Sequence, residues 1–288
     1  MPITVENLTH IYSKDGPFER IALHDVSFSI NDGELIGLIG HTGSGKSTLI
    51  QHLNGLIKPE SGKIYVDGTD ITAKGVNMRA IRSKVGMVFQ YPEYQLFEET
   101  VYRDIAFGPL NIGKTAEETD RIIHEVMSLV GLSEHILEKS PFELSGGQKR
   151  RVAIAGVLAM EPEILILDEP TAGLDPQARN NILKLIDNLH TQKKMTIILV
   201  SHSMEDIARI ADRVMVMSDG RLVMFDSAKN VFSRADELKK IGLDVPQISI
   251  VMNELRKRGV RLPEGIYTVE SALEAVMNIV KEKADYAN

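Results

Sequence analysis

The stretch GHTGSGKST, residues 40–48, constrains the fold of this chain more than any other part of its sequence. It matches the pattern G-x-x-x-x-G-K-S and joins an apolar run, ELIGLIG, to a segment with helical spacing, STLIQHLNGL. Glycines at such a junction let backbone N–H groups surround a phosphate, and the positive end of the helix points at the same place. The sequence therefore predicts a strand, a phosphate-binding loop and a helix, the central unit of an α/β fold.

The residue types in this loop predict separate tasks for its side chains. Lys46 is expected to reach the β- and γ-phosphates of a nucleotide, and the Ser47 hydroxyl is expected to bind Mg²⁺. A glycine turn without a ligand is the alternative, but the flanking strand and helix favour a phosphate site. The nucleotide contacts predicted here are Gly40, His41, Thr42, Gly43, Ser44, Gly45, Lys46, Ser47 and Thr48.

Polar side chains also follow three other apolar runs, at the point where each predicted strand ends. Asp168 and Glu169 follow ILIL; Asp168 suits a magnesium ligand and Glu169 suits the general base that polarises water. His202 follows TIILVS and is expected near the γ-phosphate, while Gln90 ends KVGMVFQ within reach of magnesium or water. Each has a plainer interpretation as a capping, loop or surface residue. Because ligands collect at the carboxyl ends of strands in open α/β sheets, their joint occurrence predicts one catalytic site.

A second candidate phosphate-binding segment is LSGGQKRR, residues 144–151, which leads into an apolar helix, VAIAGVLAM. Small residues before a helix leave backbone N–H groups free and turn the positive helix end outward. This predicts a nucleotide contact through Ser145, Gly146, Gly147 and Gln148. The next three residues form either a local basic patch or a solvated helix face: Lys149, Arg150 and Arg151.

The remaining pattern predicts further strands and a helical end. ITVENLTHIY and ALHDVSFSI are β-like runs, and Tyr12 at the end of the first is expected either to stack on a base or to pack in the core. GKIYVDGTDIT predicts a hairpin that turns at Asp67-Gly68, and RVMVMSDGRLVMFD predicts another. PQISIVMNELRKRG has Pro246 at a helix start and Gly259 as a stop, and TVESALEAVMNIVKEK predicts a second amphipathic helix.

Composition restricts the classes of protein that fit. The chain has 288 residues, no cysteine and a net charge of −7, which disfavours a disulfide-built secreted fold and wholesale binding to nucleic acid or anionic lipid. MPITVENLTH does not read as a basic, apolar leader, so a cytoplasmic location is expected. Its apolar runs are much shorter than the ~20 residues of a membrane-spanning helix. Any membrane role is therefore expected to come through a partner.

Together these residues resemble the ATP-binding subunits of ABC transporters. GHTGSGKS, Gln90, LSGGQ, ILILDE, AGLD and His202 occur in that family's order over residues 3 to about 228. The resemblance implies a P-loop NTPase of the ABC ATPase type that uses ATP and Mg²⁺, with a mixed-sheet core, an N-terminal antiparallel β subdomain and a helical signature subdomain. It also implies that two ATPases meet head to tail, so that Ser145–Gln148 serve a neighbour's ATP and Asp175 lines the shared boundary.

Aromatic residues are concentrated between residues 89 and 109, which hold six of the fifteen in the chain (7 Tyr and 8 Phe). They form either the core of a small helical subdomain or a groove for a partner helix: Phe89, Tyr91, Tyr94, Phe97, Tyr102 and Phe107. This stretch and the helical tail resemble the ATPases of energy-coupling factor transporters, most of all the second of their paired ATPases. The resemblance implies uptake of vitamins or transition-metal ions, a heterodimer, a transmembrane coupling protein and a substrate-binding membrane protein.

The expected organisation is an ATPase domain at residues 1–229, with its helical subdomain at about 90–160, and a C-terminal extension at 230–288. The two tail helices either hold two ATPases together or only cover their own domain. The peripheral location implied is the cytoplasmic face of the membrane. Two alternatives remain open at this point: an ATPase of another ABC importer class, and a soluble ABC-type ATPase with a non-membrane partner, although the chain has neither a second cassette nor a coiled-coil insertion.

Overall fold

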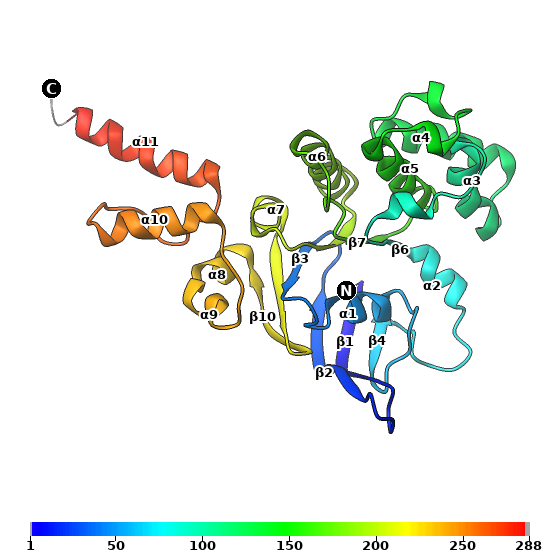
Figure 1. The fold of residues 1–288 in the computed structure, drawn as a ribbon, viewed down its shortest axis with the longest axis horizontal. Helices are drawn as coiled ribbons and strands as arrows, with labels where there is room; N and C mark the ends of the chain where they lie inside the picture. The colour runs from blue at the N-terminus through cyan, green and yellow to red at the C-terminus, as the bar shows by residue number, and fades with distance from the viewer. Residues whose placement is uncertain (1, 286–288) are drawn as a thin grey trace.

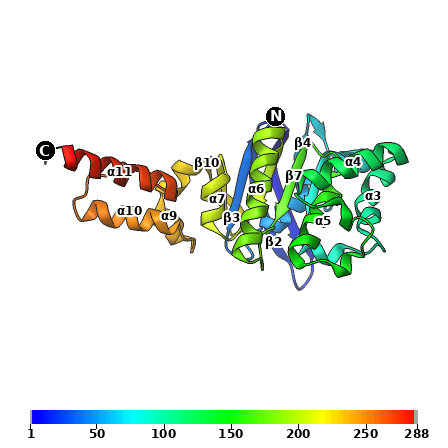
Figure 2. The same ribbon diagram turned by 90° about the horizontal axis from the view of Figure 1, so that it is seen from above.

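A computed structural model describes residues 2–285 of the chain. Within this range the backbone forms a four-stranded sheet and a six-stranded sheet, with helices packed around them (Figure 1). A helical unit lies at one end of the sheets, and a pair of helices extends as an arm from the other end (Figure 2). No helix in residues 2–285 is both long and apolar enough to cross a membrane.

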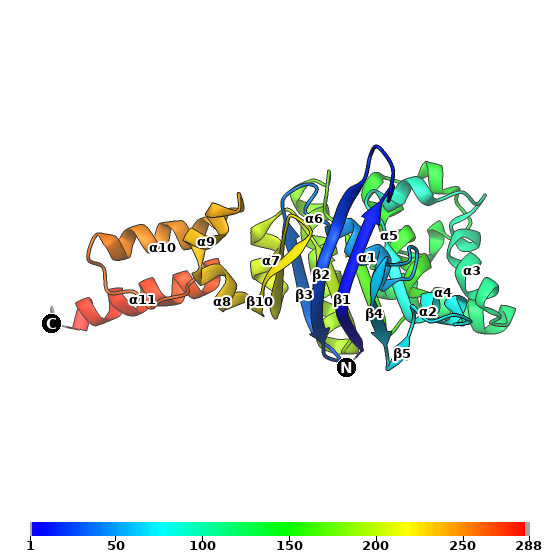
Figure 3. The same cartoon turned by 90° about the horizontal axis from the view of Figure 1, so that it is seen from below.

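The four-stranded sheet is antiparallel, in the order β2 (Arg20–Ile30), β1 (Ile3–Tyr12), β4 (Ser61–Val66) and β5 (Thr69–Asp70). The predicted turn between β4 and β5 is present, with Asp67 and Gly68 in left-handed conformations at φ 46° and 73°. Positive φ at both turn residues is what a tight hairpin with the right-handed strand twist requires. In Figure 3 this sheet covers one side of the molecule.

The six-stranded sheet has the order β10-β9-β3-β8-β7-β6. Five strands are parallel: β3 (Leu35–Gly40), β6 (Val85–Val88), β7 (Ile164–Asp168), β8 (Thr196–Val200) and β9 (Arg213–Ser218). β10 (Arg221–Ser227) pairs antiparallel with β9 and makes the sheet mixed. The parallel strands are continuous apolar runs because both of their faces are buried.

Alternate residues of these strands enter two separate cores. On β7, Ile164 and Ile166 pack with the antiparallel sheet and α1 (Lys46–Leu53), which lies between the two sheets. Leu165 and Leu167 point the other way and pack against helices that include α6 (Pro176–Lys193) and α7 (Met204–Ile210). The period-2 alternation of strand side chains therefore produces a layered α/β body.

The helical unit follows β6 in the chain and shares the second core. Its elements are η1 (Pro92–Gln95), α3 (Val101–Ile112), α4 (Ala116–Leu129), η2 (Glu134–Ile136), η3 (Pro141–Glu143) and α5 (Gly146–Leu158). α2 (Met78–Lys84) lies before β6 and places Ile81 in the first core. Val101 and Ile105 of α3 and Val152 of α5 are fully buried in that core. α5 therefore has a fixed position relative to the sheet that carries the polar strand ends.

The chain ends in α8 (Ala228–Ser233), α9 (Ala235–Lys240), α10 (Gln247–Lys257) and α11 (Val269–Asp285). The two predicted tail helices are confirmed: Pro246 caps α10, and Gly259 after it is left-handed at φ 88°. α10 and α11 lie side by side, away from the sheets (Figure 1). They have a small apolar cluster of their own, built on Met252, Ala272 and Ala275.

Candidate functional site

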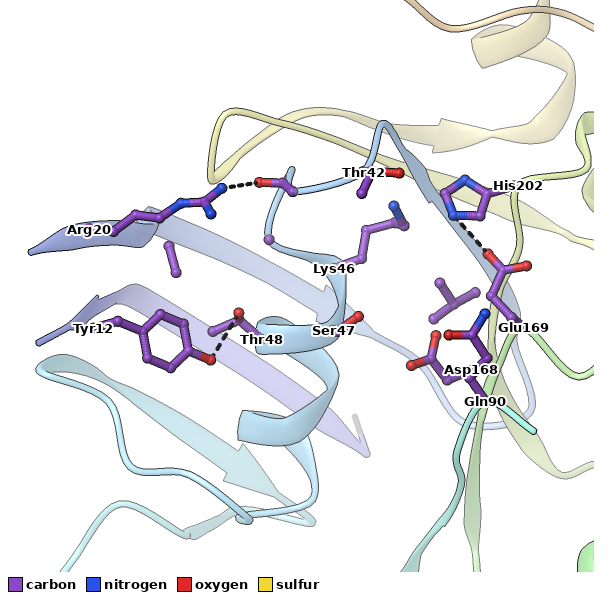
Figure 4. A pocket seen from close by; sticks show the side chains of 14 residues that line it. Tyr12, Arg20, Thr42, Lys46, Ser47, Thr48, Gln90, Asp168, Glu169 and His202 are labelled. Carbon is purple, nitrogen blue, oxygen red and sulfur yellow. Dashed lines mark hydrogen bonds and ion pairs between the residues drawn. The ribbon is translucent and has the colours of Figure 1, made fainter. Parts of the chain in front are cut away.

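The carboxyl ends of β3, β6, β7 and β8 meet around a pocket of about 280 Å³. Residues from six separate stretches of the chain line it (Figure 4): Tyr12, Arg20, Ala22, Thr42, Gly43, Gly45, Lys46, Ser47, Thr48, Gln90, Asp168, Glu169, Val200 and His202. The predicted convergence of the phosphate loop with the polar strand ends is therefore observed. The parallel register of the sheet produces it, because β6, β7, β8 and β3 all end at one edge.

The phosphate loop is an open cradle with a lysine at its centre. Gly43 and Gly45 adopt left-handed φ angles of 81° and 102°, and a Cβ on Gly45 would lie 2.6 Å from the Ala22 carbonyl oxygen. Lys46 Nζ donates hydrogen bonds to the carbonyls of Gly40 at 2.6 Å and His41 at 3.1 Å. Burial lowers the pKa of Lys46, although the nearby Glu169 and Asp168 carboxylates raise it. A buried ammonium held by carbonyl oxygens is ready to exchange them for an anionic ligand.

Glu169 differs from its neighbour Asp168 in backbone and environment. It follows the last residue of β7 with a left-handed φ of 51°, and its N–H donates to the Val200 carbonyl at 3.0 Å. Burial raises the pKa of Glu169 to about 7, and Asp168 also raises it, whereas the backbone of His202 and the charge of Lys46 lower it. A carboxylate with a pKa near neutrality is suited to accept a proton from water.

His202 faces Glu169 from the end of β8. Its Nε2 lies 3.4 Å from Glu169 Oε1, too far and poorly aligned for a strong hydrogen bond. Burial lowers the pKa of His202, and the charge of Lys46 lowers it further, so the neutral imidazole is favoured. Since the ring is half exposed, its other face is open toward the pocket (Figure 4).

Asp206 anchors the loop that carries His202. Its carboxylate is buried and accepts hydrogen bonds from Arg179 Nη2 at 2.7 Å and Thr171 Oγ1 at 3.1 Å. Arg179 also donates to Ser203 Oγ at 2.5 Å, next to His202. These contacts tie the segment after β8 to the start of α6 and to the turn after Glu169, so the histidine and the glutamate are positioned together.

Tyr12 and Arg20 form the outer wall of the pocket. The Tyr12 hydroxyl lies 3.3 Å from Thr48 Oγ1, and its ring is about two-fifths exposed at 41%. Arg20 Nη2 donates to the Gly43 carbonyl at 3.3 Å. Sequence reasoning missed Arg20, Ala22 and Val200; Arg20 pairs with Tyr12 across the β1–β2 hairpin, so the hairpin register was the signal that pointed to it.

The signature segment does not join this pocket in the described residues. Ser145 caps α5 by accepting from the Gln148 N–H at 3.4 Å, while the Gln148 side chain accepts from the Ser145 N–H at 3.0 Å. A Cβ on Gly146 would meet nothing within 4 Å among residues 2–285. The N-terminus of α5 thus presents open backbone to the outside rather than to the pocket at the strand ends of its own chain.

The two interpretations of Lys149, Arg150 and Arg151 as a basic patch or a solvated face are both wrong for Arg150. Its side chain is fully buried, and the Arg151 guanidinium donates to the Gly131 carbonyl at 2.7 Å. Lys149 and Arg151 are both half-buried, and Lys149 Nζ lies 5.6 Å from the centre of the Phe142 ring. The tertiary partners of Arg150 come from distant segments, which helical spacing does not reveal.

A family model described as ABC transporter matches residues 23–172, more than half of the chain. The chain belongs to the ABC transporter family of ATPases. It is 58% identical over 281 residues to an energy-coupling factor transporter ATP-binding protein EcfA2 of Caldanaerobacter subterraneus subsp. tengcongensis, covering 98% of each chain. It is 56% identical to the EcfA2 protein of Clostridium tetani over 99% of both.

Solved structures of ABC ATPases agree with this assignment. CbiO1 of Clostridium perfringens, part of the ABC transporter complex cbiONQ, superposes with a TM-score of 0.74 at 39% identity over 88% of this chain and 98% of that one. The dimeric cassette MJ0796 bound to ADP and Pi gives a TM-score of 0.70 at 30% identity, over 78% of this chain and 98% of that one. The expected family, its energy-coupling factor subgroup and the P-loop NTPase fold are thereby confirmed.

Proposed function

We propose that this ABC ATPase hydrolyses ATP at the pocket in Figure 4 and powers uptake of vitamins or transition-metal ions through membrane partners of the energy-coupling factor type. The observation that carries the chemical part is the buried Glu169, with a pKa near 7, beside a phosphate loop and a polar strand edge. The transport part of the proposal rests on similarity to the relatives named above.

The residues of the pocket suit MgATP. Lys46 and the loop N–H groups would hold the β- and γ-phosphates, and Tyr12 would stack on the adenine. Oxygen atoms of Ser47, Gln90 and Asp168 line one side of the pocket, which is the ligand type that Mg²⁺ prefers. When bound, magnesium supplies positive charge that offsets the charge developing on the phosphates.

Hydrolysis then depends on three side chains of this chain. Glu169 orients the attacking water and accepts its proton, which its raised pKa favours. His202 contacts the γ-phosphate from the end of β8. Gln90 lies two residues beyond β6 and links the same water or metal to the segment that follows it.

A second ATPase chain would complete the site. The open N-terminus of α5, with Ser145, Gly146, Gly147 and Gln148, would contact the ATP held by a neighbour in a head-to-tail pair. Asp175, which caps α6 by accepting from the Gln177 and Ala178 N–H groups at 2.9 Å, would lie at the same boundary. This arrangement explains why one chain has two phosphate-binding ends that do not meet.

A groove of about 640 Å³ offers a place for a helix of a transmembrane coupling protein. Its apolar lining includes Phe97 and Phe107, which are 60% and 48% exposed. These two aromatic side chains therefore do not serve only to fill the core of the helical unit. Tyr94 is 84% exposed at its margin and does not line the groove. Asp104 lines it with a buried Oδ2 that has no hydrogen-bond partner in residues 2–285. A partner helix with a cation at that point would satisfy the carboxylate.

The C-terminal extension, residues 230–288, would hold two ATPases together between turnovers. α11 exposes a series of apolar side chains: Leu273, Val276, Met277 and Val280. A row of apolar residues at helical spacing that its own domain leaves uncovered suits contact with the corresponding arm of the second ATPase. With the groove occupied and the arms paired, the chain would be held peripherally at the cytoplasmic face of the membrane.

Affinity purification of the tagged full chain from its own membranes tests the proposal. We expect a second ABC ATPase and at least one multispanning membrane protein to be recovered with it, and the complex to hydrolyse ATP. Recovery of a ribosomal or DNA-bound assembly without membrane proteins would contradict the proposal and support the soluble alternative.

A further inference from the structure

Arg150 is the most completely buried charged side chain in the described core, with 1% of its surface exposed. Its Nε and Nη2 donate to the two carboxylate oxygens of Glu93 at 2.9 and 2.5 Å. Its Nη1 donates to the carbonyls of Pro170 at 3.1 Å and Ala172 at 2.6 Å. One guanidinium therefore joins three segments far apart in the sequence: η1, α5 and the turn after β7.

Each of these segments borders a functional region. Glu93 lies in η1, whose Pro92 and Gln95 line the groove, and η1 begins two residues after Gln90. Pro170 directly follows Glu169, and the Ala172 N–H donates to the Glu169 carbonyl at 3.1 Å. The Arg150 hydrogen bonds thus hold the same short turn that orients the general base. α5 itself begins with the signature segment.

Arg150 lies between two segments that each contain a residue with an unfavourable, left-handed backbone conformation. Tyr91, between Gln90 and η1, has a left-handed φ of 54°, and Glu169 has one of 51°. Non-glycine residues persist in that region only where their surroundings hold them. Arg150 is placed to do this for both, since its Cζ also lies 5.8 Å from the centre of the Tyr91 ring.

We propose that Arg150 is a positioning residue for hydrolysis: through Glu93 and the Pro170 and Ala172 carbonyls it fixes the turn carrying Glu169 relative to η1, and transmits movement of η1 to Glu169. The second half of this inference rests on the docking groove proposed above. The first half depends only on the contacts of this chain.

If the Arg150–Glu93 ion pair only stabilised the fold, a different result would be expected. Replacing a buried ion pair by apolar residues of similar volume is often neutral or stabilising, whereas removing one partner leaves an uncompensated charge. The double variant Arg150→Met with Glu93→Leu therefore separates stability from positioning. It removes both charges together and also removes the hydrogen bonds to the Pro170 and Ala172 carbonyls.

The experiment compares wild type, Glu93→Gln and the double variant in the full chain. MgATP hydrolysis is measured with and without the co-purified membrane partners, and melting temperature and ATP affinity are measured on the chain alone. We expect kcat to fall about 10- to 100-fold in both variants, as for a displaced catalytic group, with ATP affinity within about twofold. The stimulation of hydrolysis by the partners should also disappear in the double variant.

Glu34→Gln is the matched control. Glu34 pairs with Arg213 Nη1 at 3.2 Å near the start of β3, at the opposite edge of the sheet from the pocket. It should lower the melting temperature without changing kcat. Recovery of wild-type kcat by the double variant, or an equal loss of kcat in Glu34→Gln, would overturn the role of Arg150. Failure of wild type to retain membrane partners would refute the groove instead, because kcat without partners still tests the positioning role.

Discussion

At the scale of single residues, function depends on how burial changes the charge of a few side chains. Asp168 and Glu169 are adjacent, yet the left-handed turn at Glu169 sends its carboxylate toward His202. Burial raises the pKa of both acids, and that of Glu169 reaches about 7. The neighbouring acids therefore suit the different tasks proposed for them, Asp168 as a magnesium ligand and Glu169 as the general base.

Glu169→Gln tests the general base. The amide keeps the shape of the side chain and cannot accept a proton, so ATP affinity should persist while hydrolysis falls ~10²- to 10⁴-fold. Lys46→Ala should instead weaken ATP binding, because Lys46 is the buried cation of the loop. Isothermal titration and steady-state hydrolysis measure the two effects. Normal turnover of the glutamine variant would show that another group activates the water.

His52 makes stability depend on pH. Its ring is fully buried beside the His10 ring, with Nδ1 2.7 Å from the Thr48 carbonyl. Burial lowers its pKa to about 4 from 6.5, so the folded state resists a proton that the unfolded chain accepts below pH 6.5. This contribution of His52 is absent above that pH and lowers stability as pH falls toward 4, by about 2 kcal/mol at pH 5. Glu169, whose pKa is raised to about 7, acts in the opposite direction over the same range, so the contribution of His52 is read as a difference between variants.

Urea unfolding between pH 8 and pH 5 measures this contribution. Between pH 8 and pH 5, wild type should lose about 2 kcal/mol of stability relative to His52→Leu, whatever the effect of the variant on absolute stability. An identical pH dependence in wild type and His52→Leu would assign the acid sensitivity to other groups.

At the scale of elements, the parts best predicted from sequence are those with local signals. The helix that begins at Lys46, the strand before Asp168 and the helix start at Pro246 each depend on residues adjacent in the chain, and each is confirmed. Arg150 was misjudged because its partner Glu93 is 57 residues away. Arg20 was missed because it lies beside Tyr12 only through the pairing register of β1 and β2, which the residues next to Arg20 in the chain do not reveal. Local patterns specify elements, whereas contacts between elements depend on packing.

The groove beside η1 leads to a test at this scale. Phe97→Ala with Phe107→Ala removes two exposed rings that line the groove, so the melting temperature should stay near that of wild type. Capture of the membrane partner should weaken by about 2 kcal/mol for each ring that acts as a central anchor, roughly 30-fold in Kd. Phe18→Ala, a ring 83% exposed outside the groove, is the control and should leave capture unchanged. A lowered melting temperature with intact capture would contradict docking.

At the scale of the whole molecule, the chain consists of a layered α/β body, a helical unit and an arm that contacts few other elements (Figure 2). The nucleotide pocket and the signature end of α5 are separate in one chain, and the arm has an uncovered apolar row. Both features suit a molecule that works in pairs. The separate pocket and signature end suit the closed pair of ATPases. The apolar row of the arm suits the pair between turnovers.

Pairing through the arm can be tested by placing charged residues on its apolar row. Leu273→Glu with Val280→Glu places two carboxylates on its exposed apolar row, which should leave the melting temperature unchanged and weaken pairing of nucleotide-free chains. Sedimentation velocity measures the pairing. Glu274→Lys, an exposed change next to that row, is the control. Unchanged pairing of the double variant would show that the arm only covers its own domain.

The central claim is that each ATP is held by one chain and completed by the signature of another. Ser145→Arg places bulk and charge at the open end of α5, which lies outside the pocket of its own chain. The decisive measurement is ATP binding by the isolated variant beside hydrolysis and uptake by the assembled complex in proteoliposomes. The account predicts binding like wild type with hydrolysis and uptake lost together. Loss of ATP binding by the isolated chain would contradict it, since residues 144–148 would then serve their own nucleotide.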